Sequence, residues 1–378
     1  HPEYRRQRQM CIRDSSDAGR LQLAGTVSSL GTMTSTVGTV EYDASGAQDV
    51  LADTYFNLEV DGSGVKTLAA ANITVNGDLS LTAGSLAYNS GSSSKLITLK
   101  GSVLGTGTIT ATTTSIFKID GDGTNQDIRG ISSDDIGVRL SGSANATTSG
   151  DITAKYLDLL SGSTGTFTID GETFTISPTS GYLEMDGGNL TVSGGSLINN
   201  STSETTNELD AGTLTVSGGT VTFTGNSSTN TGGDLNVDGG TLTVSSGSIS
   251  INDELDMGSG IINQSGGAIY VDAGTNNSNG TNANKFDVAT GSLNLSGGAI
   301  YVQSQSSSSY NCINIASGVS ASIESNHTFD IGTNSTAKNM YFNFGGHSIG
   351  CLNINLPAKN AYFSCLLYTS DAADDIPG

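Results

Sequence analysis

Four short segments between residues 189 and 298 repeat one pattern, in which apolar residues alternate with polar ones and two glycines close the run. They read NLTVSGG, TLTVSGG, DLNVDGG and SLNLSGG, and they begin at Asn189, Thr213, Asp234 and Ser292. Because side chains alternate across a strand, the apolar pair of each segment points to one face and the polar residue between them to the other. The glycines supply the positive φ angles that a tight turn needs. The pattern therefore predicts short β-strands joined by turns.

The spacing of these segments predicts how the strands are arranged. Corresponding apolar residues recur every seven positions, as in the steps from Leu183 to Leu190 and from Leu190 to Leu197. A coiled coil is excluded, because the intervening residues are Thr, Ser and Gly-Gly, which disfavour helix. Three seven-residue faces make a 21-residue coil, and Leu214 and Leu235 lie 21 positions apart. We therefore expect an all-β fold, a single-stranded right-handed parallel β-solenoid with three short strands per coil of about 21 residues.

Composition supports this fold and excludes some functions. Only 13% of the residues are charged, whereas about 25% is usual in a globular domain, and 51 glycines are present. Disorder is the alternative that this composition leaves open, but the apolar residues fall at alternating positions. The net charge of −21 argues against a nucleic-acid partner, which needs a basic surface. No apolar run approaches the ~20 residues of a membrane helix, so we expect no membrane insertion in this part of the chain.

The two ends of the chain lack the Gly-, Thr- and Val-rich composition of its middle. Residues 1–15 (HPEYRRQRQMCIRDS) and residues 365–378 (CLLYTSDAADDIPG) resemble translated sequencing adapters. We expect both to be non-native flanks, with real capping or targeting segments as the alternative. The solenoid is then expected to span residues 16–364 in 12 to 15 coils. Within it, Cys312 and Cys351 lie 39 positions apart, and we expect two isolated, mostly buried thiols.

One loop has the composition of a calcium site. Asp120, Asp122 and Asp127 lie on a Gly-rich segment (DGDGTNQD), and calcium prefers six to eight oxygen ligands. The segment departs from an EF-hand loop, because Thr124 and Asn125 take the places of the third ligand and the required glycine. A solvated turn is the alternative. These three carboxylates are the candidate metal ligands, and no other cofactor is expected.

Two other motifs would suit an enzyme or a metal site. Residues 344–350 (FGGHSIG) and residues 133–135 (SDD) resemble the Gly-His-Gly and paired-Asp motifs of polygalacturonases, whose carboxylates activate water and protonate the leaving group. Here they lie about 210 residues apart, so we assign no catalytic residue. A polysaccharide-acting lyase or hydrolase stays as the alternative function. His327 and His347 are a candidate metal pair on successive coils, although a third ligand is missing and two turn histidines are the simpler interpretation.

Threonines offer a third hypothesis. Thr220 and Thr222 lie 21 positions before Thr241 and Thr243, so the 21-residue coil would stack them. Such stacking resembles the flat threonine arrays of β-solenoid ice-binding proteins. The predicted ladder ends there, because Ile262 and Gln264 follow at the next step.

Residues 38–86 carry a resemblance to a known class of protein. The segments EYDASGAQ from Glu41, YFNL from Tyr55, KTL from Lys66 and ITVNGDL from Ile73 resemble the repeat units of β-strand-repeat surface proteins of Gram-negative bacteria. These include adhesins of the autotransporter and filamentous-haemagglutinin type. The resemblance implies an extracellular or cell-surface structural or adhesive rod without catalysis. Glycans or host or matrix proteins are the partners that it implies.

Overall fold

The computed structural model describes most of the chain between residues 19 and 363. The described ranges are 19–33, 36–68, 72–88, 94–177, 180–201, 207–225, 233–271, 284–302, 311–332, 340–355 and 361–363. The predicted flanks at residues 1–15 and 365–378 lie outside them.

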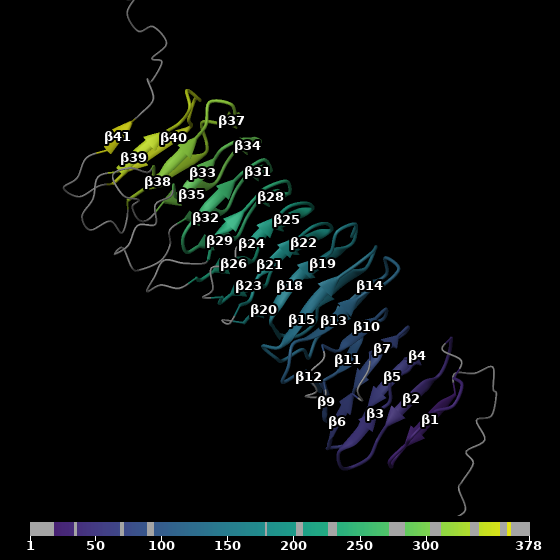
Figure 1. Cartoon of the computed structure of the whole chain (residues 1–378). Helices are drawn as coiled ribbons and strands as arrows, with labels where there is room; N and C mark the ends of the chain where they lie inside the picture. Colours follow the sequence, from purple (N-terminus) through teal and green to yellow (C-terminus); the bar gives the residue numbers. More distant parts are fainter. Residues whose placement is uncertain are drawn as a thin grey trace, which may run out of the picture.

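In these described ranges, forty-one short strands make up five parallel sheets (Figure 1). Sheet I has 14 strands: β4 (Thr54–Tyr55), β7 (Ile73–Val75), β10 (Leu96–Leu99), β13 (Ser115–Ile119), β15 (Ile136–Leu140), β18 (Tyr156–Leu159), β21 (Leu183–Met185), β24 (Asn207–Leu209), β27 (Leu235–Asn236), β30 (Leu255–Met257), β33 (Phe286–Val288), β36 (Ile313–Ile315), β39 (Met340–Asn343) and β41 (Ala361–Phe363).

Two sheets of nine strands accompany sheet I through the last two thirds of the chain. Sheet II comprises β14 (Asn125–Ile128), β16 (Asn145–Thr148), β19 (Thr166–Ile169), β22 (Asn189–Val192), β25 (Thr213–Val216), β28 (Thr241–Val244), β31 (Ile261–Gln264), β34 (Ser292–Leu295) and β37 (Ser320–Ile323). Sheet III comprises β17 (Ile152–Ala154), β20 (Thr173–Ile176), β23 (Ser196–Asn199), β26 (Thr220–Phe223), β29 (Ser248–Ile251), β32 (Ala268–Val271), β35 (Ala299–Val302), β38 (Thr328–Ile331) and β40 (Cys351–Ile354).

Two smaller sheets take the corresponding places in the first third of the chain. Sheet IV comprises β1 (Arg20–Leu23), β2 (Thr39–Tyr42), β5 (Asn57–Val60), β8 (Leu79–Leu81) and β11 (Val103–Gly105). Sheet V comprises β3 (Gln48–Val50), β6 (Val65–Leu68), β9 (Ser85–Tyr88) and β12 (Thr108–Thr110). Isolated parallel bridges from Ile109 to Ile131 and from Ser132 to Thr153 lead from sheet V to sheet III.

Each coil contributes one strand to each of three sheets, and consecutive coils pair in parallel. In one coil, β24, β25 and β26 belong to sheets I, II and III. The part of the chain that the structure describes contains no helix. The prediction of a parallel β-solenoid with three short strands per coil is therefore confirmed. The 14 strands of sheet I agree with the 12 to 15 coils expected.

The coils differ more in length than the sequence suggests. Partners one coil apart are separated by 18 residues between Thr39 and Asn57, and by 31 between Ile261 and Ser292. The predicted stacking of Leu214 on Leu235 is wrong. Leu214 pairs with Leu242, 28 residues away, whereas Leu235 lies in sheet I. The residues between β26 and β27 make this coil seven residues longer than the predicted 21. The apolar residues therefore keep their seven-residue spacing, but the strand at Leu235 belongs to a different sheet from the predicted one.

The interior is filled by the alternating apolar residues, as the sequence predicts. In Thr213–Val216 of β25, Leu214 and Val216 are fully buried, and the two threonines are partly exposed. Every described strand from β19 to β26 except β21 and β24 has four residues, with the second and fourth buried. Burying these side chains contributes about 1.5–3 kcal/mol each. The core is therefore a continuous apolar column along the rod.

Three of the four Gly-Gly pairs that close the repeated segments occupy the corner between sheets II and III, and Gly239 and Gly240 lie between sheets I and II. Successive turns stack closely at both corners. A Cβ atom at Gly219 would collide with the carbonyl oxygen of Gly195, one coil earlier. At Gly298 the backbone has φ +77°, and a Cβ atom would lie 2.6 Å from the carbonyl oxygen of Gly266. Only glycine combines this conformation with so close an approach. The glycines therefore serve coil stacking as well as turning.

Candidate functional site

The outward side chains of each sheet form columns, because the parallel register places equivalent residues one above another at about 4.8 Å. Each column is a candidate surface, since the inward residues are committed to the core. Two columns differ sharply in chemistry: the outward face of sheet I is charged, and that of sheet II is neutral from β16 to β37.

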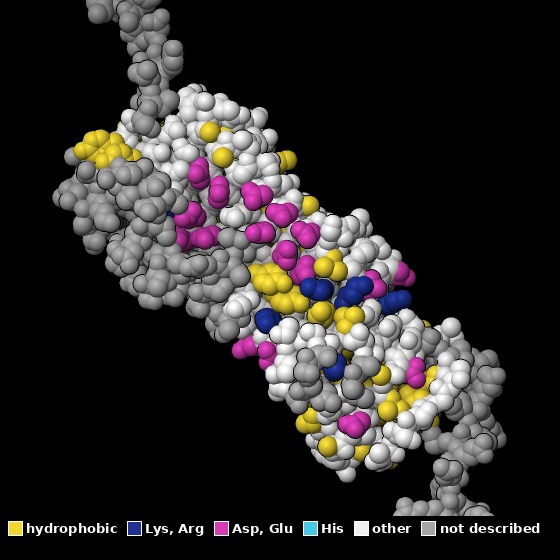
Figure 2. Space-filling model, viewed as in Figure 1, with side chains coloured by type: hydrophobic (Ala, Val, Ile, Leu, Met, Phe, Trp, Pro, Cys, Tyr) yellow, Lys and Arg dark blue, Asp and Glu magenta, His cyan; other side chains and the backbone are white. Residues whose placement is uncertain are grey.

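On sheet I, the outward column changes sign along the rod. The register runs through Lys118, Arg139, Asp158, Glu184, Glu208, Asn236, Asp256 and Asp287. Turn residues after these strands add further charge. We call the carboxylates Asp158, Glu184, Glu208, Asp256 and Asp287 the acidic ladder, with Asp186, Asp210 and Asp238 as its turn carboxylates. Lys100, Lys118, Arg139 and Lys155 form the basic patch. Figure 2 shows the acidic residues in a row that leads to the Lys and Arg side chains.

The boundary between the two signs is tightly packed. Arg139 Nε lies 2.9 Å from Asp158 Oδ2, and its guanidinium lies over the ring of Tyr156 at 5.5 Å from the centroid. The rings of Tyr156 and Tyr182 stack, with centroids 4.8 Å apart and planes 8° from parallel. Tyr156 is therefore held between a cation and an aromatic ring, which is a stable arrangement for all three side chains.

Three carboxylates of the acidic ladder hold their protons more tightly than isolated carboxylates do. Burial raises the pKa of Asp158, and Arg139 opposes that rise. Burial raises the pKa of Glu184 too, and the charges of Asp158 and Asp186 add to the effect. The pKa of Asp256 rises through burial and through the charge of Asp287. Stacking like charges on successive coils therefore disfavours their full ionisation.

The positions of the acidic ladder and Arg139 can be compared with the site that the enzyme hypothesis requires. A polysaccharide-acting solenoid needs carboxylates or arginines of adjacent coils to converge in one cleft. Sheet I does place such groups on adjacent coils, but as a line along the face seen in Figure 2. The sequence analysis missed this line, because its members are 19 to 31 residues apart and no constant period reveals them.

Sheet II carries two outward columns without charge. Between Asn145 of β16 and Ile323 of β37, none of the eight strands contains a charged residue. One column is Thr147, Thr168, Thr191, Thr215, Thr243, Asn263, Asn294 and Ser322. The second is Thr166, Asn189, Thr213, Thr241, Ile261, Ser292 and Ser320. We call this surface the neutral face.

The neutral face corrects the predicted threonine ladder. Thr241 and Thr243 stack on Thr213 and Thr215, and Thr220 pairs with Ser248. The predicted stack of Thr220 on Thr241 is wrong because the intervening insertion moves Thr241 to another sheet. In its place, five consecutive threonines run from Thr147 to Thr243. The threonine ladder in the structure therefore spans five coils, whereas the sequence predicted a different ladder over only two.

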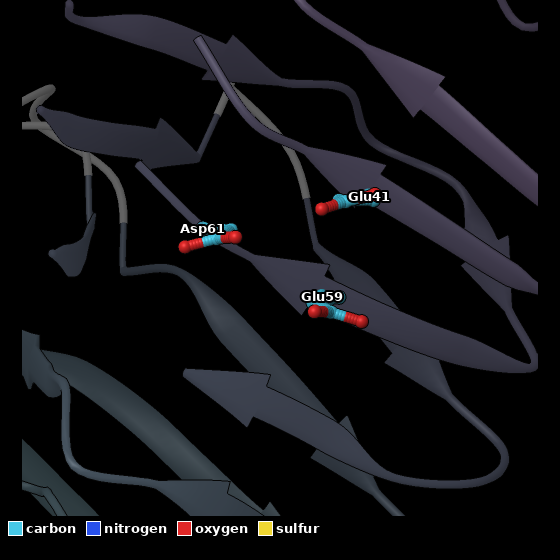
Figure 3. A group of neighbouring side chains, drawn as sticks. All are labelled: Glu41, Glu59 and Asp61. Atoms are coloured by element: carbon cyan, nitrogen blue, oxygen red, sulfur yellow. The ribbon is translucent and has the colours of Figure 1, made fainter. Parts of the chain in front are cut away.

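A group of carboxylates that the sequence analysis did not select lies on sheet IV. Oxygen atoms of Glu41, Glu59 and Asp61 fall within 4.8 Å of one another (Figure 3). Arg20 Nε lies 2.9 Å from Glu41 Oε2, and Arg20 also forms an ion pair with Glu59. A single guanidinium is thus already paired with two of the three carboxylates. The 18-residue spacing of Glu41 and Glu59 matches the local coil and could have revealed the pair.

The predicted calcium ligands are engaged separately. Asp120 Oδ1 accepts a hydrogen bond from Ser141 Oγ at 2.7 Å, and Asp120 Oδ2 lies 3.4 Å from Lys118 Nζ. Asp122 Oδ1 accepts from Thr124 Oγ1 at 2.8 Å, which lowers the pKa of Asp122. Asp127 lies within strand β14. The structure does not gather the three carboxylates into one group within 4.8 Å.

The histidines also occupy separate positions. His327 is fully buried, and its Nδ1 lies 3.1 Å from the Gly297 carbonyl oxygen. His347 Nε2 lies 3.0 Å from the Ala316 carbonyl oxygen. The register that pairs Thr328 with Cys351 places Gly350, not His347, beside His327. The two histidines therefore do not form the candidate stacked pair, and each lies against a backbone carbonyl, in agreement with the simpler interpretation as turn histidines. Asp134 and Asp135 precede β15, far from both along the rod.

Buried charge lies beside the corner between sheets III and I. Lys285 and Asp253 form an ion pair with side chains 1% and 3% exposed. Burial raises the pKa of nearby Asp234 to about 6, and the charge of Asp253 contributes to that rise. Removing either partner of such a pair destabilises the fold, because the other charge is then buried without compensation. Neither of the two cysteines that the structure describes forms a disulfide, as expected, but only Cys312 is buried and Cys351 is exposed.

No protein-family model, curated protein or solved structure matches this chain. Among the described residues, no helix has the length and apolar character needed to cross a membrane.

Proposed function

We propose that this chain is a structural and adhesive rod of an extracellular or cell-surface protein, and that the neutral face binds uncharged glycans. The observation that carries the proposal is the absence of charge from eight successive strands of sheet II in a chain of net charge −21. The proposal assigns no catalytic residue.

The chemistry of the neutral face suits such a ligand. Its hydroxyl, amide and methyl groups can exchange hydrogen bonds with sugar hydroxyls without desolvating a charge. The array also repeats, so weak contacts on successive coils add up along an extended chain. Asn294 Nδ2 donates to Asn263 Oδ1 at 2.9 Å, and Thr147 Oγ1 donates to Asn125 Oδ1 at 3.0 Å, so neighbouring side chains order one another.

A glycan array and pull-down on insoluble polysaccharides test the proposal. The variant Thr191→Lys with Thr215→Lys places two charges on the neutral face and is expected to abolish binding. Its matched control is Thr175→Lys with Thr222→Lys, because these threonines face outward from sheet III and Thr222 belongs to the coil of Thr215. The control is expected to bind normally. If the unaltered chain binds no glycan and no matrix protein, only the structural role stands.

Ice binding is a second candidate function, favoured by the five stacked threonines of the neutral face. A regular array of hydroxyls and methyls on a rigid sheet can order water at fixed spacings. Inhibition of ice recrystallisation, lost in the Thr191→Lys and Thr215→Lys variant and kept in its control, would support this function over glycan binding. Normal ice growth in the presence of the unaltered chain would exclude it.

A further inference from the structure

We infer that two copies of this chain associate antiparallel through the outward face of sheet I, the basic patch of each copy lying against the acidic ladder of the other. The inference does not depend on the proposed function, because it concerns a different face.

The first argument is charge complementarity within one face. Lys118 and Arg139 lie one coil apart and directly precede Asp158 and Glu184 in the same column. A two-fold axis that lies in the interface plane, perpendicular to the rod axis at the level of Asp158, brings the two faces together and reverses the order of coils in the second copy. Arg139 then faces the level of Glu184, and Lys118 faces that of Glu208. Because the contact is isologous, each pairing occurs twice.

The second argument is the imbalance of charge on the isolated rod. Glu184, Asp186 and Asp256 form no ion pair with any residue that the structure describes. Burial and neighbouring carboxylates raise the pKa of Glu184 and Asp256. A basic patch from a second copy would offset this repulsion, since complementary charge steers and orients association.

The third argument is the composition at the centre of the face. Tyr156 and Tyr182 stack at the boundary between the two signs, close to the inferred axis, and Arg139 packs on Tyr156. Tyrosine and arginine are enriched at the centres of protein interfaces. Figure 2 shows hydrophobic side chains beside the Lys and Arg residues at this point.

The expected interface is small. Seven strands at about 4.8 Å and roughly 15 Å of strand length give on the order of 500 Å² per copy. The total of about 1,000 Å² is near the lower limit for a specific interface. We therefore expect weak association, with a Kd on the order of 10 μM and strong dependence on salt.

Sedimentation velocity of the whole chain, with reductant and chelator present, tests the inference. We expect a dimer at about 0.01 M salt, where the Debye length is about 30 Å, and a monomer at about 1 M, where it is about 3 Å. A chain that is monomeric at about 100 μM in low salt would overturn the inference, because that concentration exceeds the expected Kd.

Charge exchange identifies the face. Lys118→Glu with Lys155→Glu makes the basic patch acidic, and Glu184→Lys with Asp186→Lys makes the ladder partly basic. Each variant alone is expected to be monomeric, and an equimolar mixture is expected to form a heterodimer. Dimerisation of either variant alone, or failure of the mixture to associate, would overturn the antiparallel contact.

Carbodiimide cross-linking of the unaltered chain keeps the inference testable if a variant fails to fold. Mass spectrometry of the low-salt dimer should join peptides containing Lys118 or Lys155 to peptides containing residues 184–210. Cross-links at other faces would contradict the inference.

Discussion

The outward faces of sheets I and II are built on the same coils yet have opposite chemistry. Sheet I stacks Asp158 on Glu184, whereas sheet II stacks Thr168 on Thr191. The inward residues of both sheets are apolar and buried. The comparison shows that coil stacking sets only the inward half of each strand. Charge and binding capacity are free to vary on the outward half, face by face.

The largest expected effect tests whether the two faces share one core. Replacing the fully buried Leu214 by Ala is expected to reduce the free energy of unfolding by about 2–5 kcal/mol, because it leaves a cavity. Chemical denaturation measures the effect, with Thr215→Ala on the outward side of the same strand as the control. Equal effects of the two substitutions would mean that the inward and outward assignment of β25 is wrong.

The next prediction concerns the pH dependence of stability, to which the charged face of sheet I should contribute and the neutral face should not. Folding raises the pKa of Asp158, Glu184, Asp210 and Asp256, so the native state binds protons more tightly than the unfolded chain. Stability is therefore expected to rise as pH falls through these raised pKa values, and to be fully gained only below the ordinary carboxyl pKa values. Asp234 adds to the gain between its raised pKa of about 6 and the ordinary aspartate value of 3.8.

His327 opposes this trend, because burial lowers its pKa and the unfolded chain then binds the proton first as pH falls below 6.5. The measurement is therefore a difference between variants, in which His327 cancels. Thermal unfolding from pH 4 to pH 7 should show a weaker pH dependence in Glu184→Gln with Asp256→Asn than in the unaltered chain. Thr191→Val should leave the pH dependence of stability unchanged. A change in this variant would mean that the neutral face also contributes to the pH dependence, against the expected difference between the two faces.

A single charge reversal gives a smaller effect. Glu184→Lys places a cation between Asp158 and Glu208 in the column, and it is expected to stabilise the chain by about 0.2–1 kcal/mol. The gain should vanish at about 1 M salt, where charges are screened beyond about 3 Å. Thr191→Lys on the neutral face serves as the comparison and should bring no such gain. A gain that persists at high salt would point to packing rather than charge.

The smallest effect is expected on the neutral face itself. Thr215→Val removes one hydroxyl from the ladder and should change the free energy of unfolding by no more than about 0.5 kcal/mol, because the side chain is partly exposed. Equilibrium denaturation checks this value. A large loss would show that the threonine ladder stabilises the fold, which would weaken its assignment as a binding surface.

The sequence by itself determined the strands, the parallel solenoid and the inward residues. Alternation around Leu190, Leu214 and Leu242 sufficed for this, because period two fixes which side chains share a face. The Gly-Gly pairs likewise marked real corners. Only the tertiary structure decided which strand lies on which.

The physical reason is the variable length of the corners. An insertion of about seven residues before Leu235 preserves the apolar phase but moves the next strand to another sheet. Which residues share an outward column depends on how strands of neighbouring coils pair, and not on the seven-residue spacing of the apolar residues. The full threonine ladder and the acidic ladder therefore became visible only once the coils were stacked.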